Sequence, residues 1–340
     1  NTSNAVMGTF GNSNFIGAFM GMFIGTLCVL LVESLGQTRK AIFFLVTMCL
    51  SFYVVFLSDA LQGLLVSIFG VALVLFFYLR SKPNSYKFSS IYLISGFIFS
   101  LIGFVGILNK GPLASLLYKP SITFRWEYWS AGLNMGVRNP VLGVGIDSYG
   151  SNYRTYRNES STVFPGVDVT TDAAHNVFID VFAGTGIIGF ASYLIIILIV
   201  LRYAFSYIKM SKSFDPVFLA LFIPWLGYQL QSIISINQIG LAVWGWIFFG
   251  IAFSLSRKRK LIDRLDRNMS TIFVPVTIFV TFFSFVFVTI PSWRADSALK
   301  QLASVPREQQ GVDANSISGS LNILNYSDQT IVYHVSPHTE

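Results

Sequence analysis

Eight stretches of apolar residues, each close to 20 residues long, alternate with polar segments along the chain. A helix that crosses the roughly 30 Å hydrocarbon core of a bilayer needs about 20 such residues. The pattern therefore predicts eight membrane-spanning helices. They cover approximately residues 15–32, 41–57, 61–79, 90–108, 176–201, 216–236, 239–255 and 271–291.

One polar segment, residues 109–175, is much longer than the other connections and is rich in Tyr, Ser, Asn, Gly and charged residues. A connection of this length is usually functional. Its first part predicts a helix that begins after the N-cap residue Ser121 and stops at Asn139 and Pro140. The residues that recur at helical spacing, and that we expect to form one apolar face, are Ile122, Trp126, Trp129, Leu133 and Val137.

Composition supports a membrane protein, since 53% of residues are hydrophobic and only 11% are charged, against about 25% charged in soluble domains. The predicted fold class is all-α, a polytopic transmembrane helical bundle of about eight spans with one long, partly helical extracytoplasmic loop. Cys28 and Cys49 both fall within predicted spans, so they indicate neither a disulfide nor a metal site.

Basic residues orient the bundle, because Lys and Arg in short loops stay on the cytoplasmic side. Of the 23 basic residues, 14 fall in connections on one side of the predicted bundle. The long loop, the N-terminus and the C-terminal tail are therefore expected outside a plasma membrane. The basic residues on the cytoplasmic side are Arg39, Lys40, Arg80, Lys82, Lys87, Arg202, Lys209, Lys212, Arg257, Lys258, Arg259, Lys260, Arg264 and Arg267.

The excess of basic residues on the cytoplasmic side explains the net charge of +7. The run at 257–260 fits an anchor near anionic lipid, so no nucleic-acid partner is expected. We predict a transmembrane domain over residues 1–291, with the long loop at 109–175. A polar extracytoplasmic tail follows at 292–340 and is either the start of a truncated helical domain or disordered.

Four arginines in the long loop, Arg125, Arg138, Arg154 and Arg157, are candidate ligands of an anionic substrate. Arg125 falls near the start of the predicted helix, where the positive end of the helix dipole disfavours a cation and a bound anion would offset that cost. Arg154 and Arg157 share a face if their segment is helical. Snorkelling of these two side chains to lipid phosphate is the alternative.

His175 is the only histidine before the last seven residues of the chain. We expect the fifth span to begin near Thr171 or Asp172, which places His175 in its first turn. The helix dipole there opposes protonation, and an imidazole that stays neutral at pH 7 can act as a general base. A hydrogen-bonded boundary residue without catalytic function is the alternative.

The chain contains no D-x-D, H-E-x-x-H, Walker A or Cys/His cluster, and Asp168 with Asp172 is too sparse for a metal site. We therefore expect no cofactor and metal-independent chemistry. Group transfer from a lipid diphosphate fits these residues, because arginines neutralise the diphosphate while a histidine deprotonates the incoming hydroxyl. The aromatic residues Trp126, Tyr128 and Trp129 suit either a membrane interface or stacking on a sugar.

Four segments together resemble the O-antigen ligase and O-antigen polymerase superfamily of bacterial polysaccharide assembly. The first is Gly-Thr-Phe-Gly-Asn-Ser-Asn at residues 8–14, and the second runs from the helix at 125–129 into Asn-Pro-Val-Leu-Gly-Val-Gly at 139–145. The third is Ala-His-Asn at 174–176 followed by Gly-Ile-Ile-Gly at 186–189, and the weakest is residues 229–237.

The resemblance implies that Arg125 binds the diphosphate of an undecaprenyl-linked glycan and that His175 is the base. We expect Asn176, Trp129 and Asp180 to have supporting roles at this site. Members often carry an acidic residue two positions before the first glycine of Gly-x-x-Gly, whereas this chain has Gly184 there and Asp180 one turn earlier.

The preferred hypothesis is therefore glycan transfer from an undecaprenyl-diphosphate donor to an acceptor hydroxyl, as in an O-antigen ligase. A polysaccharide polymerase of the same superfamily differs only in its acceptor: it adds to another lipid-linked glycan, whereas a ligase adds to a lipid A core or a protein. A transporter or flippase for the lipid-linked glycan is the alternative from another class. Such proteins need ionisable or broken-helix sites near the middle of the bilayer, whereas Glu33, Asp59 and Asp180 lie near predicted span ends.

Overall fold

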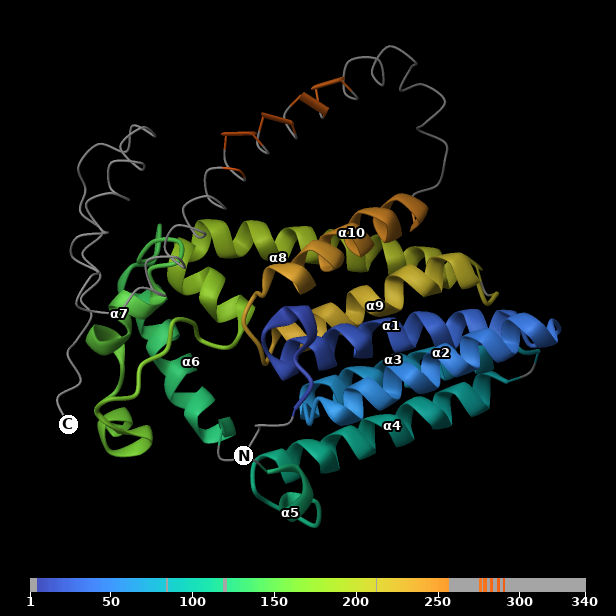
Figure 1. Cartoon of the computed structure of the whole chain (residues 1–340), viewed down its shortest axis with the longest axis horizontal. Coiled ribbons are helices and arrows are strands. Elements are labelled where there is room, and N and C mark those ends of the chain that lie inside the picture. Colours follow the sequence, from blue (N-terminus) through green and yellow to red (C-terminus); the bar gives the residue numbers. More distant parts are fainter. Residues whose placement is uncertain are drawn as a thin grey trace, which may run out of the picture. The chain divides into compact units, whose positions relative to one another are not determined.

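The computed structural model describes residues 5–83, 85–118, 121–211 and 213–256, together with scattered residues between 275 and 290. Within these residues the chain is built of helices joined by short connections (Figure 1). The long helices are α1 (Ser13–Glu33), α2 (Thr38–Leu57), α3 (Leu61–Ser81), α4 (Tyr86–Ile107), α6 (Ser121–Arg138), α8 (Val177–Ser211), α9 (Pro216–Ser232) and α10 (Ile239–Ser256). The short ones are η1 (Gly8–Phe10), α5 (Ala114–Leu117), α7 (Tyr149–Tyr156) and η2 (Thr162–Gly166).

The predicted polytopic helical bundle is confirmed. Six of the described helices, α1, α2, α3, α4, α8 and α10, are long and apolar enough to cross a membrane. The predicted span at 216–236 corresponds to α9, which has 17 residues and ends at Ser232, earlier than predicted. Most of the eighth predicted span, 271–291, and the basic run at 257–260 lie outside the described residues.

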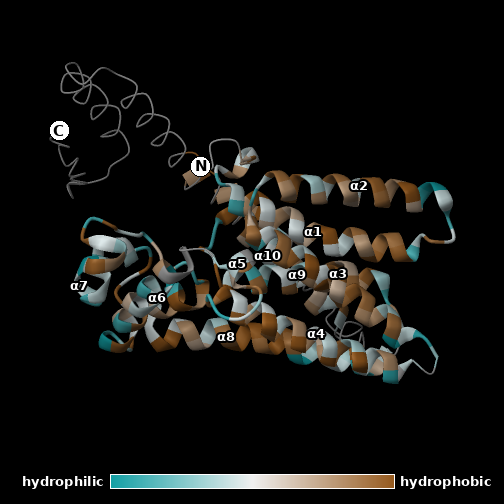
Figure 2. Cartoon of the chain, turned by 90° about the horizontal axis from the view of Figure 1, so that it is seen from below, coloured by the Kyte–Doolittle hydropathy of each residue, from teal (hydrophilic) through white to brown (hydrophobic). Residues whose placement is uncertain are grey.

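The chain divides into two compact units, residues 1–258 and 259–340. In the first unit, α1 to α4 run side by side and α9 packs against α1 and α3 (Figures 1 and 2). In the second unit, the few described residues between 275 and 290 are helical. The site residues predicted from the sequence all belong to the first unit.

Helices α1 and α3 form the centre of the first unit by packing backbone against backbone. A Cβ added at Gly63 of α3 would lie 2.6 Å from the carbonyl carbon of Gly17 in α1. Small residues permit this close approach where the surrounding lipid offers no hydrophobic driving force. A buried hydrogen bond from Gln62 Nε2 to Gln231 Oε1, 3.0 Å long, then ties α3 to α9. This satisfied amide pair fixes how α9 sits on the central helix pair.

Helices α6 and α7 lie beyond the end of the bundle at which α1 begins (Figure 1). The sequence prediction of a helix ending at Asn139 is confirmed, since α6 ends at Arg138. Glycines on one side of α6 let α8 approach closely, and a Cβ at Gly132 would lie 2.6 Å from Cγ2 of Ile179. The contact between α6 and α8 positions the candidate site.

Helix α8 is broken at Gly186, which has a φ of +63° and a ψ of −162°. Only glycine adopts this conformation readily. The break frees backbone groups, and the turn after α6 pairs with them. Val144 N–H donates to the Ala183 carbonyl (2.8 Å), Gly145 N–H to the Gly184 carbonyl (3.1 Å), and Ile187 N–H to the Pro140 carbonyl (2.7 Å).

These hydrogen bonds give the Asn-Pro-x-x-Gly-x-Gly and Gly-x-x-Gly segments one structural role. The two segments form a single joint in which each satisfies the backbone of the other. A broken helix is tolerated in a membrane protein only when its freed peptide groups find such partners. The glycines of the turn thus approach the backbone of α8 closely.

Candidate functional site

The prediction that His175 lies in the first turn of the fifth span is wrong by a few residues. Helix α8 begins at Val177, and Asn176 is its N-cap, because Asn176 Oδ1 accepts the N–H groups of Phe178 (3.0 Å) and Ile179 (3.2 Å). Asn and Asp are strong N-caps, and this cap stops the helix from extending back to Thr171. His175 therefore lies in the turn that leads into α8.

The backbone of His175 is left-handed, with a φ of +55°. This conformation is uncommon for a residue with a side chain, and its cost is borne by the surrounding contacts. One such contact is the Asp180 carboxylate, whose Oδ1 accepts the N–H of Ala174 at 2.6 Å. Asp180 and Asn176 thus hold the turn on either side of His175.

The ring of Tyr128 stacks on the imidazole of His175, with centroids 5.7 Å apart and planes inclined by 29°. Tyr128 is itself held, because the hydroxyl of buried Tyr149 donates to the Tyr128 carbonyl. Burial raises the pKa of the Tyr149 phenol, and the nearby Asp180 carboxylate raises it further. Tyr149 therefore stays a hydrogen-bond donor at ordinary pH.

Arg125 lies on α6 close enough to His175 to act on its charge. Burial lowers the pKa of His175 below its usual value, and the Arg125 guanidinium lowers it further. Both effects favour the neutral imidazole. From the sequence, we attributed a neutral His175 to the helix dipole. In the structure, the causes are burial and the Arg125 guanidinium.

The Arg125 guanidinium is half-buried, and burial lowers its pKa. In the part of the chain that the structure describes, it makes neither a hydrogen bond nor an ion pair. A partly buried cation without a partner is costly unless an anion joins it. A neutral base beside such a cation is therefore an arrangement suited to an anionic substrate with a hydroxyl to deprotonate.

The other three arginines of the long loop have different surroundings. Arg157 Nη1 donates to the carbonyls of Val167 (3.2 Å) and Val169 (3.4 Å). Exposed Arg138 lies over the ring of Tyr156, 5.7 Å from its centroid. Arg154 is exposed in the last turn of α7. The helix ends at Tyr156, so Arg154 and Arg157 do not share a helical face as the conditional prediction proposed.

Trp129 differs from the other described residues of the predicted apolar face, which are exposed in the structure. It packs with Ala131, Tyr149 and Tyr153 in a small core between α6, α7 and α8. Its indole Nε1 is buried without a hydrogen-bond partner among the described residues. Trp126 and Leu133 remain exposed. The helix buries the side that carries glycines 132 and 136, because the absence of side chains there lets α8 pack closely.

Sequence reasoning treated Tyr128 as an aromatic residue for a membrane interface or for stacking on a sugar, and it did not single out Tyr149. Tyr128 is three residues after Arg125 on α6, so helical spacing could have indicated that both lie near one site. No local pattern pointed to Tyr149. Among the described residues, no group of three His, Cys, Asp or Glu side chains comes together as candidate metal ligands.

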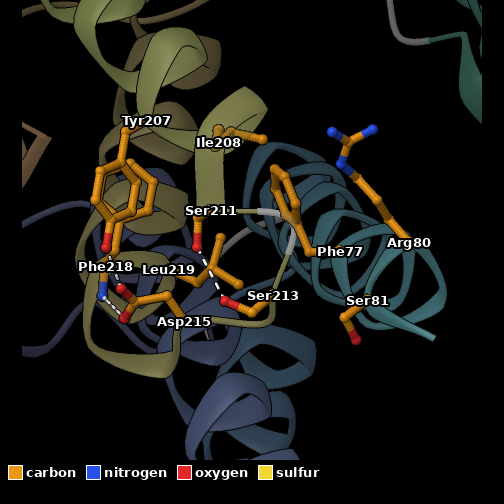
Figure 3. Close-up of a pocket in the computed structure, with 10 residues that line it drawn as sticks. All are labelled: Phe77, Arg80, Ser81, Tyr207, Ile208, Ser211, Ser213, Asp215, Phe218 and Leu219. Atoms are coloured by element: carbon orange, nitrogen blue, oxygen red, sulfur yellow. Dashed lines mark hydrogen bonds between the residues drawn. The ribbon is translucent and has the colours of Figure 1, made fainter. Parts of the chain in front are cut away.

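A small depression lies at the other end of α8, between that helix, α3 and α9. Figure 3 shows Tyr207 donating its hydroxyl to the Asp215 carboxylate, which also accepts the N–H of Phe218 at 3.0 Å, while Arg80 extends away from this pair. Most of the 35 residues of α8 separate the depression from His175. It is not part of the His175 site.

Six apolar helices among the described residues, and a site in the connection between two of them, define a multi-pass membrane protein with a polar site outside its helical bundle. Residues 27–194 match a family model described as O-antigen ligase. This segment includes Arg125, His175 and the joint at Gly186, and the match supports a relationship to the O-antigen ligase and polymerase superfamily. No curated protein matches the chain. The match supports glycan transfer of the ligase or polymerase type in general.

Proposed function

We propose that the protein transfers a glycan from an undecaprenyl-diphosphate donor to an acceptor hydroxyl at the outer face of the plasma membrane. The observation that carries the proposal is the pairing of Arg125, a half-buried guanidinium without a described partner, with a neutral His175. The Arg125 guanidinium suits binding of the diphosphate, and the His175 imidazole suits deprotonation of the hydroxyl.

In the proposed reaction, His175 takes the proton of the acceptor hydroxyl as its oxygen attacks the anomeric carbon of the donor glycan. The new bond forms as the bond between that carbon and the diphosphate oxygen breaks. The diphosphate leaves as an anion that Arg125 stabilises, and the proton remains on His175 until it passes to solvent. Fixed charge placed where negative charge develops is the largest catalytic effect in many enzymes. Because the guanidinium supplies that charge, the proposed reaction requires no metal ion.

The remaining candidate residues have supporting roles in this proposal. Asp180 and Asn176 hold the turn that presents His175, and Trp129, four residues after Arg125, packs α6 against its small core. The outlying arginines, Arg138, Arg154 and Arg157, lie farther along the same loop and attract the anionic donor. Charged residues at the edge of a site mainly change the rate at which the substrate associates and the dependence of that rate on salt.

The outer placement rests on the distribution of basic residues, which favours a cytoplasmic location for the connections opposite the long loop. Transfer to a lipid or protein acceptor and polymerisation onto a second lipid-linked glycan both fit this chemistry. A flippase is less well supported, because Glu33 ends α1 and Asp59 follows α2, which leaves these acidic groups near helix ends.

A transfer assay with matched variants tests the proposal. The purified protein is incubated with an undecaprenyl-diphosphate glycan, candidate acceptors and a metal chelator, and glycosylated product is measured. His175→Ala should lower the rate by roughly 10²- to 10⁴-fold, the usual contribution of a general base. Arg125→Lys should lower it by about 10-fold, because an ammonium cannot reproduce the bidentate fork of a guanidinium.

Arg154→Lys is the matched control, since it makes the same substitution at an exposed position and keeps the charge. It should retain the rate of the unchanged protein. Undiminished transfer by His175→Ala would rule out the base role. Equal losses for the Arg125 and Arg154 variants would rule out a specific diphosphate contact. The acceptor that is glycosylated distinguishes a ligase from a polymerase, and translocation of the donor without transfer would indicate a carrier.

A further inference from the structure

Helix α6 carries two apolar faces, although only one of them packs against protein. The buried face includes Ala131 and Met135. The second consists of Trp126, Leu133 and Val137, whose positions fall within about 40° of one another at 100° per residue. It lies on nearly the opposite side of the helix. A helix that projected into water would carry polar residues there.

The turn after α6 extends this second face. Its side chains Val141, Leu142 and Ile146 join those of α6, and the six together are 44% to 76% exposed. We call these six residues, Trp126, Leu133, Val137, Val141, Leu142 and Ile146, the α6 apolar surface. An exposed apolar surface of this extent marks a contact with another protein or with a membrane.

The α6 apolar surface is continuous with the lipid-facing side of a membrane-spanning helix. A Cβ at Gly186 of α8 would lie 2.5 Å from the Val141 carbonyl carbon, so the turn lies directly on the break in α8. The next residues of α8, Ile187 and Ile188, are 51% and 57% exposed and begin a run of exposed apolar residues along the span. Figure 2 shows apolar residues on both α6 and α8.

The length of α8 places this joint near the boundary of the membrane. Its 35 residues would extend about 52 Å, whereas the hydrocarbon core is roughly 30 Å thick. Counting about 20 residues back from Arg202, which is expected on the cytoplasmic side, puts the start of the core near Phe182. The first turns of α8, and α6 packed against them, therefore lie close to the interfacial region.

The polar group on the exposed side of α6 is also satisfied without water. Ser130 lies between Trp126 and Leu133 on this side, and its hydroxyl donates to the Trp126 carbonyl at 2.8 Å. A helical serine that donates to the carbonyl four residues earlier leaves no unpaired hydroxyl hydrogen, so Ser130 is compatible with a lipid environment. Trp126 itself suits the headgroup level, because its ring is apolar with one polar edge.

We propose that the α6 apolar surface docks into the bilayer leaflet next to it, so that α6 is an interfacial membrane helix. The partner is lipid, with acyl chains against Leu142 and Ile146 and headgroups near Trp126. Arg125 is one residue from Trp126 and so faces along the membrane surface, about 100° from the lipid-facing side. If the proposed function holds, a lipid-linked diphosphate reaches Arg125 without leaving the headgroup layer.

Spin labelling in lipid nanodiscs tests the docking without any measurement of activity. Single cysteines replace Val137, Leu142 or Ile146 in a protein in which Cys28 and Cys49 are changed to Ala. Ser151→Cys, at an exposed polar position of α7, is the matched control. The ratio of label collisions with oxygen to collisions with a water-soluble nickel complex should shift from below one at Ser151 to above one at Leu142 and Ile146.

A ratio below one at Leu142 and Ile146, as at Ser151, would place the surface in water and overturn the proposal. Low collision rates with both reagents would overturn it as well, because a protein segment, such as the C-terminal tail or a second copy of the chain, would then cover the surface. Since these outcomes are independent of catalysis, docking can fail while glycan transfer stands. Transfer can equally fail while docking stands.

Discussion

At the scale of single residues, the protonation state of His175 is the property most open to measurement. Burial and the Arg125 guanidinium both lower its pKa. A lowered pKa leaves more neutral base at acidic pH. The ordinary pKa of histidine is about 6.5. The acid limb, the pH range in which the transfer rate falls as the pH is lowered, should therefore lie below pH 6.5.

Arg125→Gln should move this limb toward higher pH, because it removes the cation and leaves the burial. The pH dependence of kcat/KM, measured between pH 5 and 8 for the unchanged protein and the variant, reports this shift. Arg154→Gln, at an exposed position, should leave the limb in place. An acid limb that does not move in Arg125→Gln would mean that Arg125 does not act on the base.

The residues of the site were predictable to the extent that their chemistry is rare in this chain. His175 was conspicuous because no other histidine occurs before the last seven residues, and Arg125 because a cation near a helix start needs an explanation. The hydrogen bond from Ala174 to Asp180 and the stacking of Tyr128 on His175 were not predictable, because both depend on how α6 packs against α8.

At the scale of elements, the joint between α8 and the turn after α6 determines where the site lies. Gly186→Ala places a Cβ 2.5 Å from the Val141 carbonyl carbon and requires a φ that alanine avoids. It should cost roughly 1–3 kcal/mol or more from backbone strain alone. Thermal unfolding in detergent measures the loss as a lower Tm.

Gly96→Ala is the matched control for this substitution, since Gly96 is also inside a candidate span and has no atom within 4 Å of an added Cβ. Its Tm should be unchanged or slightly raised, because alanine favours helix more than glycine does. Equal Tm values for the two variants would contradict the role given to the joint.

The helices were largely predictable because an apolar run of about 20 residues leaves few alternatives to a span. The end of α6 followed from Asn139 and Pro140 in the same way. The break in α8 was not predictable, since the apolar run continues through Gly186. What stabilises the break is a set of hydrogen bonds from residues about 40 positions earlier, and local periodicity carries no information about them.

At the scale of the whole molecule, the distribution of charge predicts which end of the bundle faces out. Ser151→Cys lies in the long loop and Ser213→Cys in the basic connection between α8 and α9, and both positions are exposed. In intact cells, a membrane-impermeant maleimide should label the first and not the second. The reverse pattern would invert the bundle and remove the site from the outer face.

Residues 140–145 and 183–187 hydrogen-bond to each other through their backbones. This pairing affects the construction of chimaeras from related chains. Because the pairing runs from main chain to main chain, side chains on either segment can vary as long as the peptide groups keep their partners. A chimaera that receives one segment from a relative inherits half of a matched pair, whereas one that receives both inherits a working unit. The two stretches should be transplanted together, as one cassette.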